Sequence, residues 1–405
     1  MRRARSCRSA AIAVLIHFHF VSLALAQAPP PLDPLESMWM RVGPFGFTPS
    51  IAVTDFGVDS NVFRTAEEPR RDFTATIAPR FDVRLRAGRF LLWAWNATGF
   101  TYYAETSDQR SISYANEVRA DVDLGRFRPF ATAAILETRD RLNAELDVRA
   151  PRLSRSVSGG AKVSMGTRTA LTVSGRVSDL EFEEGTTFEG VSLPRNLNSR
   201  VEAADAALDI ALTPLTTFKL LASVQQDRFD QSPERDSDSI RILPGLQFDP
   251  VALIHGSLAL GYRRFNPLSP AIPDYTGFIM QGSLGYTLLD RTRFEGLLNR
   301  DVQYSFEDFE PYYLSTGVRV RVTHHLAGPW DVEASVGRER LGYRAIGGTD
   351  DPRTDRADLI GVGAGYRIRE NARIALNWEY TDRHSGRPDR RYERRRFYGT
   401  FTFGQ

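Results

Sequence analysis

The sequence predicts an all-β protein, a single transmembrane antiparallel β-barrel of about eighteen strands. Three observations predict it: the strand-like alternation is long, charges gather on one face of each strand, and tight turns alternate with longer polar loops. Residues 72–103 show all three, with alternation over about fifteen residues, a turn at Ala87-Gly88 and a return strand. Successive strand side chains point to opposite faces, so such a strand has one apolar and one charged wall.

Strand length and charge both favour a membrane. Transmembrane strands need about nine to eleven residues, whereas soluble strands usually run to five or six. The polar face carries Arg80, Asp82 and Arg84, and an Arg facing lipid at mid-bilayer costs roughly 2–4 kcal/mol. We therefore expect this face to line a water-filled lumen. Alternation alone would also fit a soluble propeller or sandwich. The length of the strands is the evidence against these folds.

The connections give the strand count. Tight turns are expected near residues 87–88, 125–126, 166–167, 213–214, 249–250, 290–291, 328–329 and 370–371, with a longer polar connection between each pair of them. Outer-membrane barrels show this alternation, with short periplasmic turns, longer extracellular loops and both termini in the periplasm. The count gives eighteen strands, and sixteen is the alternative.

The N-terminus has the pattern of a secretory signal. Four arginines precede an apolar segment that ends at Ala24-Leu25-Ala26, which predicts a signal peptide at residues 1–26. A proline-rich periplasmic leader (27–45) and the barrel (46–405) follow. Cleavage would remove Cys7, the single cysteine, and leave 48 basic against 50 acidic residues. The mature chain then has no thiolate ligand and no cysteine for lipid attachment.

The charged faces of several strands provide the candidate functional residues. We expect them to line the lumen and tune its selectivity. A register slip of one residue would turn all the candidate charged side chains of that strand toward the outside of the barrel. The candidates are Arg80, Asp82, Arg84, Arg86, Glu117, Arg119, Asp121, Arg319, Arg321, Arg373 and Glu379.

No sequence pattern predicts an enzyme, a cofactor or a metal site. His324 and His325 are adjacent, so they point to opposite faces of a strand and cannot share a metal there. Gly361, Gly363 and Gly365 occupy alternate strand positions, which favours close approach of neighbouring groups over phosphate binding. A Ser-His pair formed across strands is the catalytic alternative, since triad partners need not be close in sequence.

Two charged segments have open interpretations. Asp350, Asp351 and Asp355 could meet a divalent ion or remain solvated. The densest basic run could contact lipopolysaccharide phosphates, pair with acids in the lumen, or form a solvated strand end; it comprises Arg390, Arg391, Arg394, Arg395 and Arg396.

Both ends of the chain resemble the families described as putative outer-membrane β-barrel porins. The first motif is Asp55, Gly57, Asp59, Ser60, Asn61, Val62 and Phe63, and the second comprises Trp378, Tyr380, Arg383, Ser385, Tyr398, Phe401 and Phe403. The resemblance implies an outer-membrane barrel. Some members accompany exopolysaccharide or capsule export, which implies that role by analogy. The sequence differs from the usual pattern of such barrels at its C-terminus. It ends in Gly404-Gln405, whereas the last strand recognised by the assembly machinery usually ends on an aromatic residue.

Together these features predict a bacterial outer-membrane channel for passive diffusion of hydrophilic solutes. The alternative is a non-conducting or plugged barrel associated with exopolysaccharide or capsule export or with surface assembly. Expected partners are membrane lipid, lipopolysaccharide, the barrel-assembly machinery and the solutes, with no nucleic acid. The sequence identifies neither the solute nor an oligomer interface.

Overall fold

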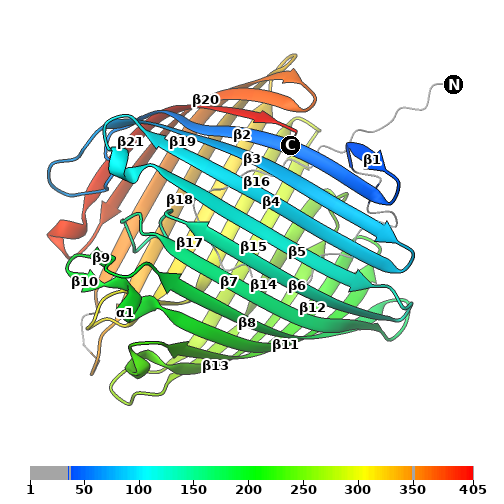
Figure 1. Cartoon of the computed structure of the whole chain (residues 1–405), viewed down its shortest axis with the longest axis horizontal. Coiled ribbons are helices and arrows are strands. Elements are labelled where there is room, and N and C mark those ends of the chain that lie inside the picture. Colours follow the sequence, from blue (N-terminus) through cyan, green and yellow to red (C-terminus); the bar gives the residue numbers. More distant parts are fainter. Residues whose placement is uncertain (1–34, 36–37, 349–351, 405) are drawn as a thin grey trace.

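Eighteen antiparallel strands form a closed barrel (Figure 1). The computed structural model describes residue 35 and residues 38–348 and 352–404. Every barrel strand pairs with its neighbours in sequence, and β2 pairs with β21 to close the ring. The predicted fold class is confirmed, while the predicted signal peptide lies outside the described residues.

The barrel strands are long enough to span a bilayer, since they contain from 12 to 16 residues. They are β2 (Phe45–Asp59), β3 (Asp72–Ala87), β4 (Phe90–Tyr103), β5 (Ser111–Val122), β6 (Phe127–Thr138), β7 (Arg152–Ser164), β8 (Thr169–Phe182), β11 (Ser199–Thr213), β12 (Thr216–Phe229), β13 (Ser237–Phe248), β14 (Ile254–Pro267), β15 (Tyr275–Leu288), β16 (Thr292–Tyr304), β17 (Tyr312–His325), β18 (Trp330–Arg344), β19 (Thr354–Arg369), β20 (Ala372–His384) and β21 (Tyr392–Phe403).

Short and long connections alternate strictly around the ring, as predicted. All short turns therefore lie at one end of the barrel and all long loops at the other. The loop after β8 contains the short strands β9 (Thr187–Phe188) and β10 (Val191–Ser192) and the helix α1 (Leu193–Leu197). Among the described residues, no helix has the length and apolar character needed to cross a membrane.

Contacts through the barrel opening identify the inner face. Arg383 in β20 is hydrogen-bonded to Asp147, which belongs to the connection between β6 and β7, so Arg383 points inward. Alternate residues share a face, which places Glu379 and Arg373 inside and Leu376 outside. Leu376 is 60% exposed, and the register extends this apolar outer wall to the other strands.

The porin-like motif near the N-terminus lies at the seam between β2 and β21. Arg394 Nε donates to both carboxylate oxygens of Asp59 at 2.9 Å, and both residues are buried. Arg396 forms an ion pair with Asp55. Of the interpretations of the basic run, pairing with acids on neighbouring strands therefore holds for Arg394 and Arg396.

Backbone geometry at the seam explains the other motif residues. Asp55 has φ +57° and lies in a bulge, where the pairing shifts between Val53 and Phe56. A Cβ at Gly57 would lie 2.1 Å from the Phe397 carbonyl oxygen, so only glycine fits there. Asn61 donates to the Glu393 carbonyl oxygen at 3.2 Å. The motif thus ties the first barrel strand to the last one.

The short strand β1 (Met40–Val42) pairs with the part of β2 that β21 does not reach. It lies within the expected leader and pairs with the start of β2, whereas β21 ends opposite Ile51. Trp39 packs edge-on against Phe403, with ring centroids 5.5 Å apart. The last aromatic residue of the chain is thereby held against Trp39, the residue that precedes β1.

Replacing Val83 with Arg is expected to impair barrel assembly, whereas Arg84→Ala should leave the barrel assembled. Val83 lies opposite Phe47 and Ala94 on the outer wall, and Arg84 lies opposite Trp93 on the inner wall. A guanidinium facing lipid costs roughly 2–4 kcal/mol. Heat-modifiable gel migration measures the folded fraction, and equal loss of the folded band in both variants would contradict these facings.

Candidate functional site

Four long connections meet over one opening of the barrel. We call them the mouth loops; they are residues 139–151, 183–198, 305–311 and 385–391. Ser305 Oγ donates to Glu145 Oε1 at 2.6 Å, and Asn196 donates to the Phe306 carbonyl oxygen at 2.7 Å. The strands that carry these two loops are β6 and β7 for the first and β16 and β17 for the third. Apart from these, six strands (β8 and β11 to β15) lie between the loops on one side of the ring, and eight lie between them on the other. The Glu145–Ser305 contact therefore spans the opening.

An apolar cluster lies at the centre of the mouth loops. Its buried members come from three of the loops and from the end of β8: Leu146, Ala150, Phe182, Leu193, Leu197 and Phe306. Leu193 and Phe306 are completely buried. Ser192 caps α1 by accepting from the Arg195 backbone N–H at 3.4 Å. Burial of these side chains gives the loops a packed core of their own.

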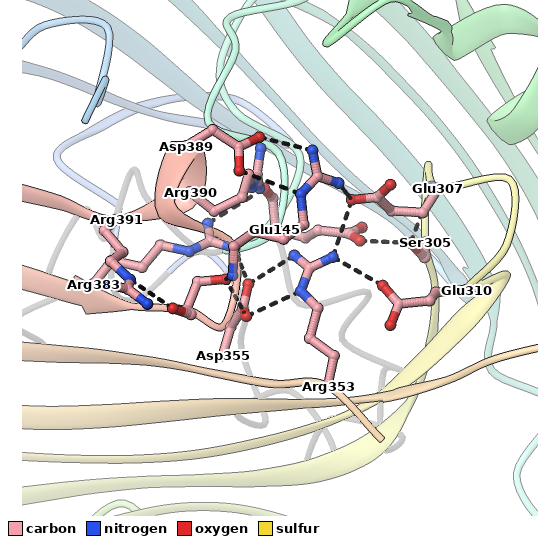
Figure 2. A network of polar contacts seen from close by, with 12 residues as sticks. Glu145, Ser305, Glu307, Glu310, Arg353, Asp355, Arg383, Asp389, Arg390 and Arg391 are labelled. Carbon is pink, nitrogen blue, oxygen red and sulfur yellow. Dashed lines mark hydrogen bonds and ion pairs between the residues drawn. The ribbon is translucent and has the colours of Figure 1, made fainter. Parts of the chain in front are cut away.

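Arginines connect the mouth loops to the ends of the last strands (Figure 2). Arg383 lies between Asp147 at 2.7 Å and Asp355 at 2.8 Å, and its side chain is 1% exposed. Arg353 binds Asp355 as well, at 2.9 Å, and also Glu310 at 2.8 Å. The shared carboxylate makes these contacts one network.

A second group of contacts joins the last mouth loop to the others. Arg390 pairs with Glu189 at 2.8 Å and lies 4.8 Å from the ring centroid of Phe188. Arg387 pairs with Glu307 at 2.6 Å. The side chains of Arg390 and Arg383 are each 1% exposed; charges buried in this way are stable only when paired, and removal of one partner typically costs about 3–5 kcal/mol. The mouth loops are thus held closed by paired charges around an apolar centre.

Glu145 is the titratable group at the centre of this structure. Burial raises its pKa to about 7, although the Ser305 hydrogen bond and the nearby Arg390 and Arg383 favour the charged form. The neighbouring Glu307 raises the pKa further. Protonation of Glu145 therefore favours its buried position.

Closure of the mouth loops is expected to weaken as pH rises from about 4.5 to about 7. Over this interval the buried Glu145 retains a proton that an exposed glutamate, with a pKa of 4.5, has released. The stabilisation is present at low pH and is lost as pH rises through the pKa of the buried form. Channel conductance measured from pH 5 to 8 should increase. Glu145→Gln should remove this dependence, and an unchanged pH profile in the variant would contradict it.

All eleven predicted charged residues lie on the same face of the barrel as Arg383. Several form ion pairs within the wall: Arg80–Asp82 at 2.8 Å, Arg119–Asp121 at 2.9 Å, Arg321–Glu333 at 3.0 Å, Arg373–Asp331 at 3.0 Å and Arg396–Glu379 at 3.5 Å. Arg84, Arg86, Glu117 and Arg319 share this face by register. In the Arg80–Asp82 and Arg119–Asp121 pairs, side-chain exposure is between 15 and 32%.

The glycines of β19 make room for side chains on this inner face. A Cβ at Gly365 would lie 2.3 Å from Arg373 Nη2 and 2.5 Å from Asp331 Oδ1. The Arg373–Asp331 pair therefore passes over β19 where that strand has no side chain. This is the close approach that the sequence predicts for the alternating glycines.

The other sequence candidates have structural partners. Asp355 is bound by Arg353 and Arg383, while Asp350 and Asp351 lie outside the described residues. His324 contacts Thr292 and His325 contacts Arg367, so the two histidines face opposite sides. Across the described ranges, no group of three or more His, Cys, Asp and Glu side chains could hold a metal ion.

Sequence reasoning missed the mouth network. Asp147, Glu145 and Arg353 lie in loops, where no alternation assigns a direction to a side chain. Arg383 follows the inward phase of β20. Asp355 and Arg390 belong to the two charged segments noted in the sequence, but their partners in the loops could not be assigned.

An apolar outer wall, a charged inner wall and loops folded over one opening define this protein as a porin-like outer-membrane β-barrel. The family model for putative beta-barrel porin 2 matches residues 33–403, and the chain belongs to this family. No curated protein matches the sequence.

Solved structures with a similar fold include three outer-membrane proteins. OccK3 (OpdO) of Pseudomonas aeruginosa is 12% identical, with a TM-score of 0.48 over 88% of this chain and 95% of that one. OccK9 (OpdG) of the same organism is 11% identical, with a TM-score of 0.49 over 88% and 98%. The FrpB iron transporter of Neisseria meningitidis is 9% identical, with a TM-score of 0.45 over 84% of this chain and 62% of that one.

Proposed function

We propose that the protein is a passive diffusion channel for hydrophilic solutes, with the eleven inner charged residues as its selectivity lining. The long loops face the cell exterior, and the short turns and both termini face the periplasm. This orientation is the one that barrels with short turns near their termini adopt. Insertion then requires the barrel-assembly machinery, and the outer wall contacts membrane lipid.

The observation that supports the proposal is how few strands each ion pair of the wall spans. Along the wall, pairs join residues of one strand, such as Arg80 and Asp82, or strands at most three positions apart, such as Arg241 and Asp301. Ion pairs of this reach hold the described side chains against the wall, and we propose that water fills the centre of the lumen. Among the described side chains, the ion pairs that join distant strands are those of the mouth loops. An aqueous path with restricted access at one end follows, because barrels of sixteen to eighteen strands can enclose a channel.

Charge reversal of the wall tests this function. Arg84→Glu combined with Arg86→Glu should shift the reversal potential in a salt gradient toward cation selectivity, because both residues lie on the inner face of β3. Arg395→Glu is the control, since Arg395 is on the outer wall and 65% exposed. Equal reversal potentials for the wild-type and the doubly substituted barrels would contradict the lining.

The buried mouth network favours a second candidate, a barrel that is closed at rest. Its role would then be export or surface assembly of polysaccharide, as in the systems that some members of similar families accompany. A folded wild-type barrel that never conducts between pH 5 and 8 would support this candidate. Spontaneous conductance would support the diffusion channel.

A further inference from the structure

Basic side chains gather on the outer wall at the long-loop ends of β18, β19 and β20. Arg340 lies directly opposite Arg356, and Arg356 lies opposite His384. These three residues form a row across neighbouring strands on the outer face, and Arg338 lies in the next row. We call Arg338, Arg340, Arg356 and His384 the outer basic cluster.

The cluster has more positive charge than its own acids neutralise. Like charges directly opposite each other destabilise a sheet, and Arg340 and Arg356 are such a pair. Asp358 binds Arg338 at 2.6 Å and Arg356 at 3.0 Å, and Asp382 lies 3.4 Å from His384. Two carboxylates therefore face three arginines and a histidine. No acidic partner of Arg340 is present among the described residues. An external anion would relieve this repulsion.

A groove provides space for the anion. Its volume is about 590 Å³, and it is lined by Arg338, Arg340, Thr354, Arg356, His384 and Ser385. The guanidinium groups are open to solvent, with Arg338 63% and Arg356 43% exposed. The planar donor fork of arginine matches phosphate oxygens in a bidentate manner. The lining chemistry therefore fits a phosphate group better than a neutral ligand.

The position of the groove indicates where the phosphate comes from. Below Arg338 and Asp358, the next row on the same face consists of Val336 and Ile360, which are exposed apolar residues of the outer wall. The groove therefore lies at the upper edge of the lipid-facing surface, the level of lipid headgroups. We infer that the outer basic cluster binds the phosphate group of a membrane lipid headgroup. Other arginines at the long-loop end of the outer wall are paired with acidic residues: Arg155 pairs with Glu181, and Arg200 pairs with Glu202.

Calorimetric titration of the refolded full-length mature barrel in detergent micelles tests the inference. The ligands are diphosphorylated lipid A, its dephosphorylated form and inorganic phosphate. We expect the wild-type barrel to bind the diphosphorylated lipid on the order of tenfold more tightly than the dephosphorylated one, which is the size of a charge-assisted contact. The Arg340→Gln/Arg356→Gln variant should lose this preference.

Arg155→Gln/Arg200→Gln is the matched control, because it removes two exposed outer-wall arginines from the other side of the barrel. This control should retain the preference, and gel migration should show that both variants are folded. The inference is overturned if the wild-type barrel does not discriminate between the lipids, or if the cluster variant retains the wild-type preference. Displacement of the lipid by an equal concentration of inorganic phosphate would overturn the assignment to a lipid headgroup.

Discussion

Arg383→Ala is expected to open the mouth of the barrel and to raise its single-channel conductance. Arg383 is the cation between Asp147 of the first mouth loop and Asp355 of β19, and all three are buried. Without it, two carboxylates remain close to each other with one fewer positive charge. A loss of about 3 kcal/mol, the low end for a broken buried pair, shifts the ratio of closed to open mouth roughly a hundredfold.

The control for this variant is Arg155→Ala, an identical change at an exposed residue of the outer wall. It should conduct like the wild-type barrel. Deletion of a charge from the wall could also alter conductance, so ion selectivity should be measured in the same recordings. Unchanged conductance in a folded Arg383→Ala barrel would show that the mouth loops do not restrict access.

Arg394→Ala is expected to prevent stable closure of the barrel. The substitution leaves Asp59 buried at the seam without its bidentate partner, at a cost of about 3–5 kcal/mol. Such a loss is a large part of the 5–15 kcal/mol by which most proteins are stable. The folded band on an unheated gel should be reduced strongly, and the midpoint of urea unfolding should fall.

Arg395→Ala provides the comparison on the same strand. Arg395 points outward and pairs with the exposed Glu393 at 3.4 Å, and exposed pairs contribute about 0–1 kcal/mol. This variant should unfold with the wild-type midpoint. Equal destabilisation by both substitutions would contradict the structural role of the Asp59–Arg394 pair.

Local sequence patterns were sufficient to predict the strands and turns that form the wall of the barrel. In β3 the alternation from Phe73 to Leu85 assigns each side chain to a face, and Gly88, with φ +60°, marks the following turn. A strand repeats every two residues and a turn needs particular residues, so both leave a short-range signal. The same reasoning assigned eleven charged residues to one face of the wall, and their role as a selectivity lining stays a prediction.

Long-range pairs leave no such signal. Asp59 and Arg394 are 335 residues apart, and Glu145 meets Ser305 across 160 residues. Neither residue type nor spacing tells which carboxylate meets which arginine, because the pairing depends on the closed ring and on the path of the loops. The mouth network therefore became visible only in three dimensions.

The most direct test of the account is single-channel recording of the refolded mature chain in a planar lipid bilayer. For a porin-like barrel with a restricted mouth, we expect discrete ohmic steps whose size increases in Arg383→Ala. Absence of conductance in both the wild-type barrel and Arg383→Ala, with folding shown by gel migration, would contradict an aqueous path through the lumen.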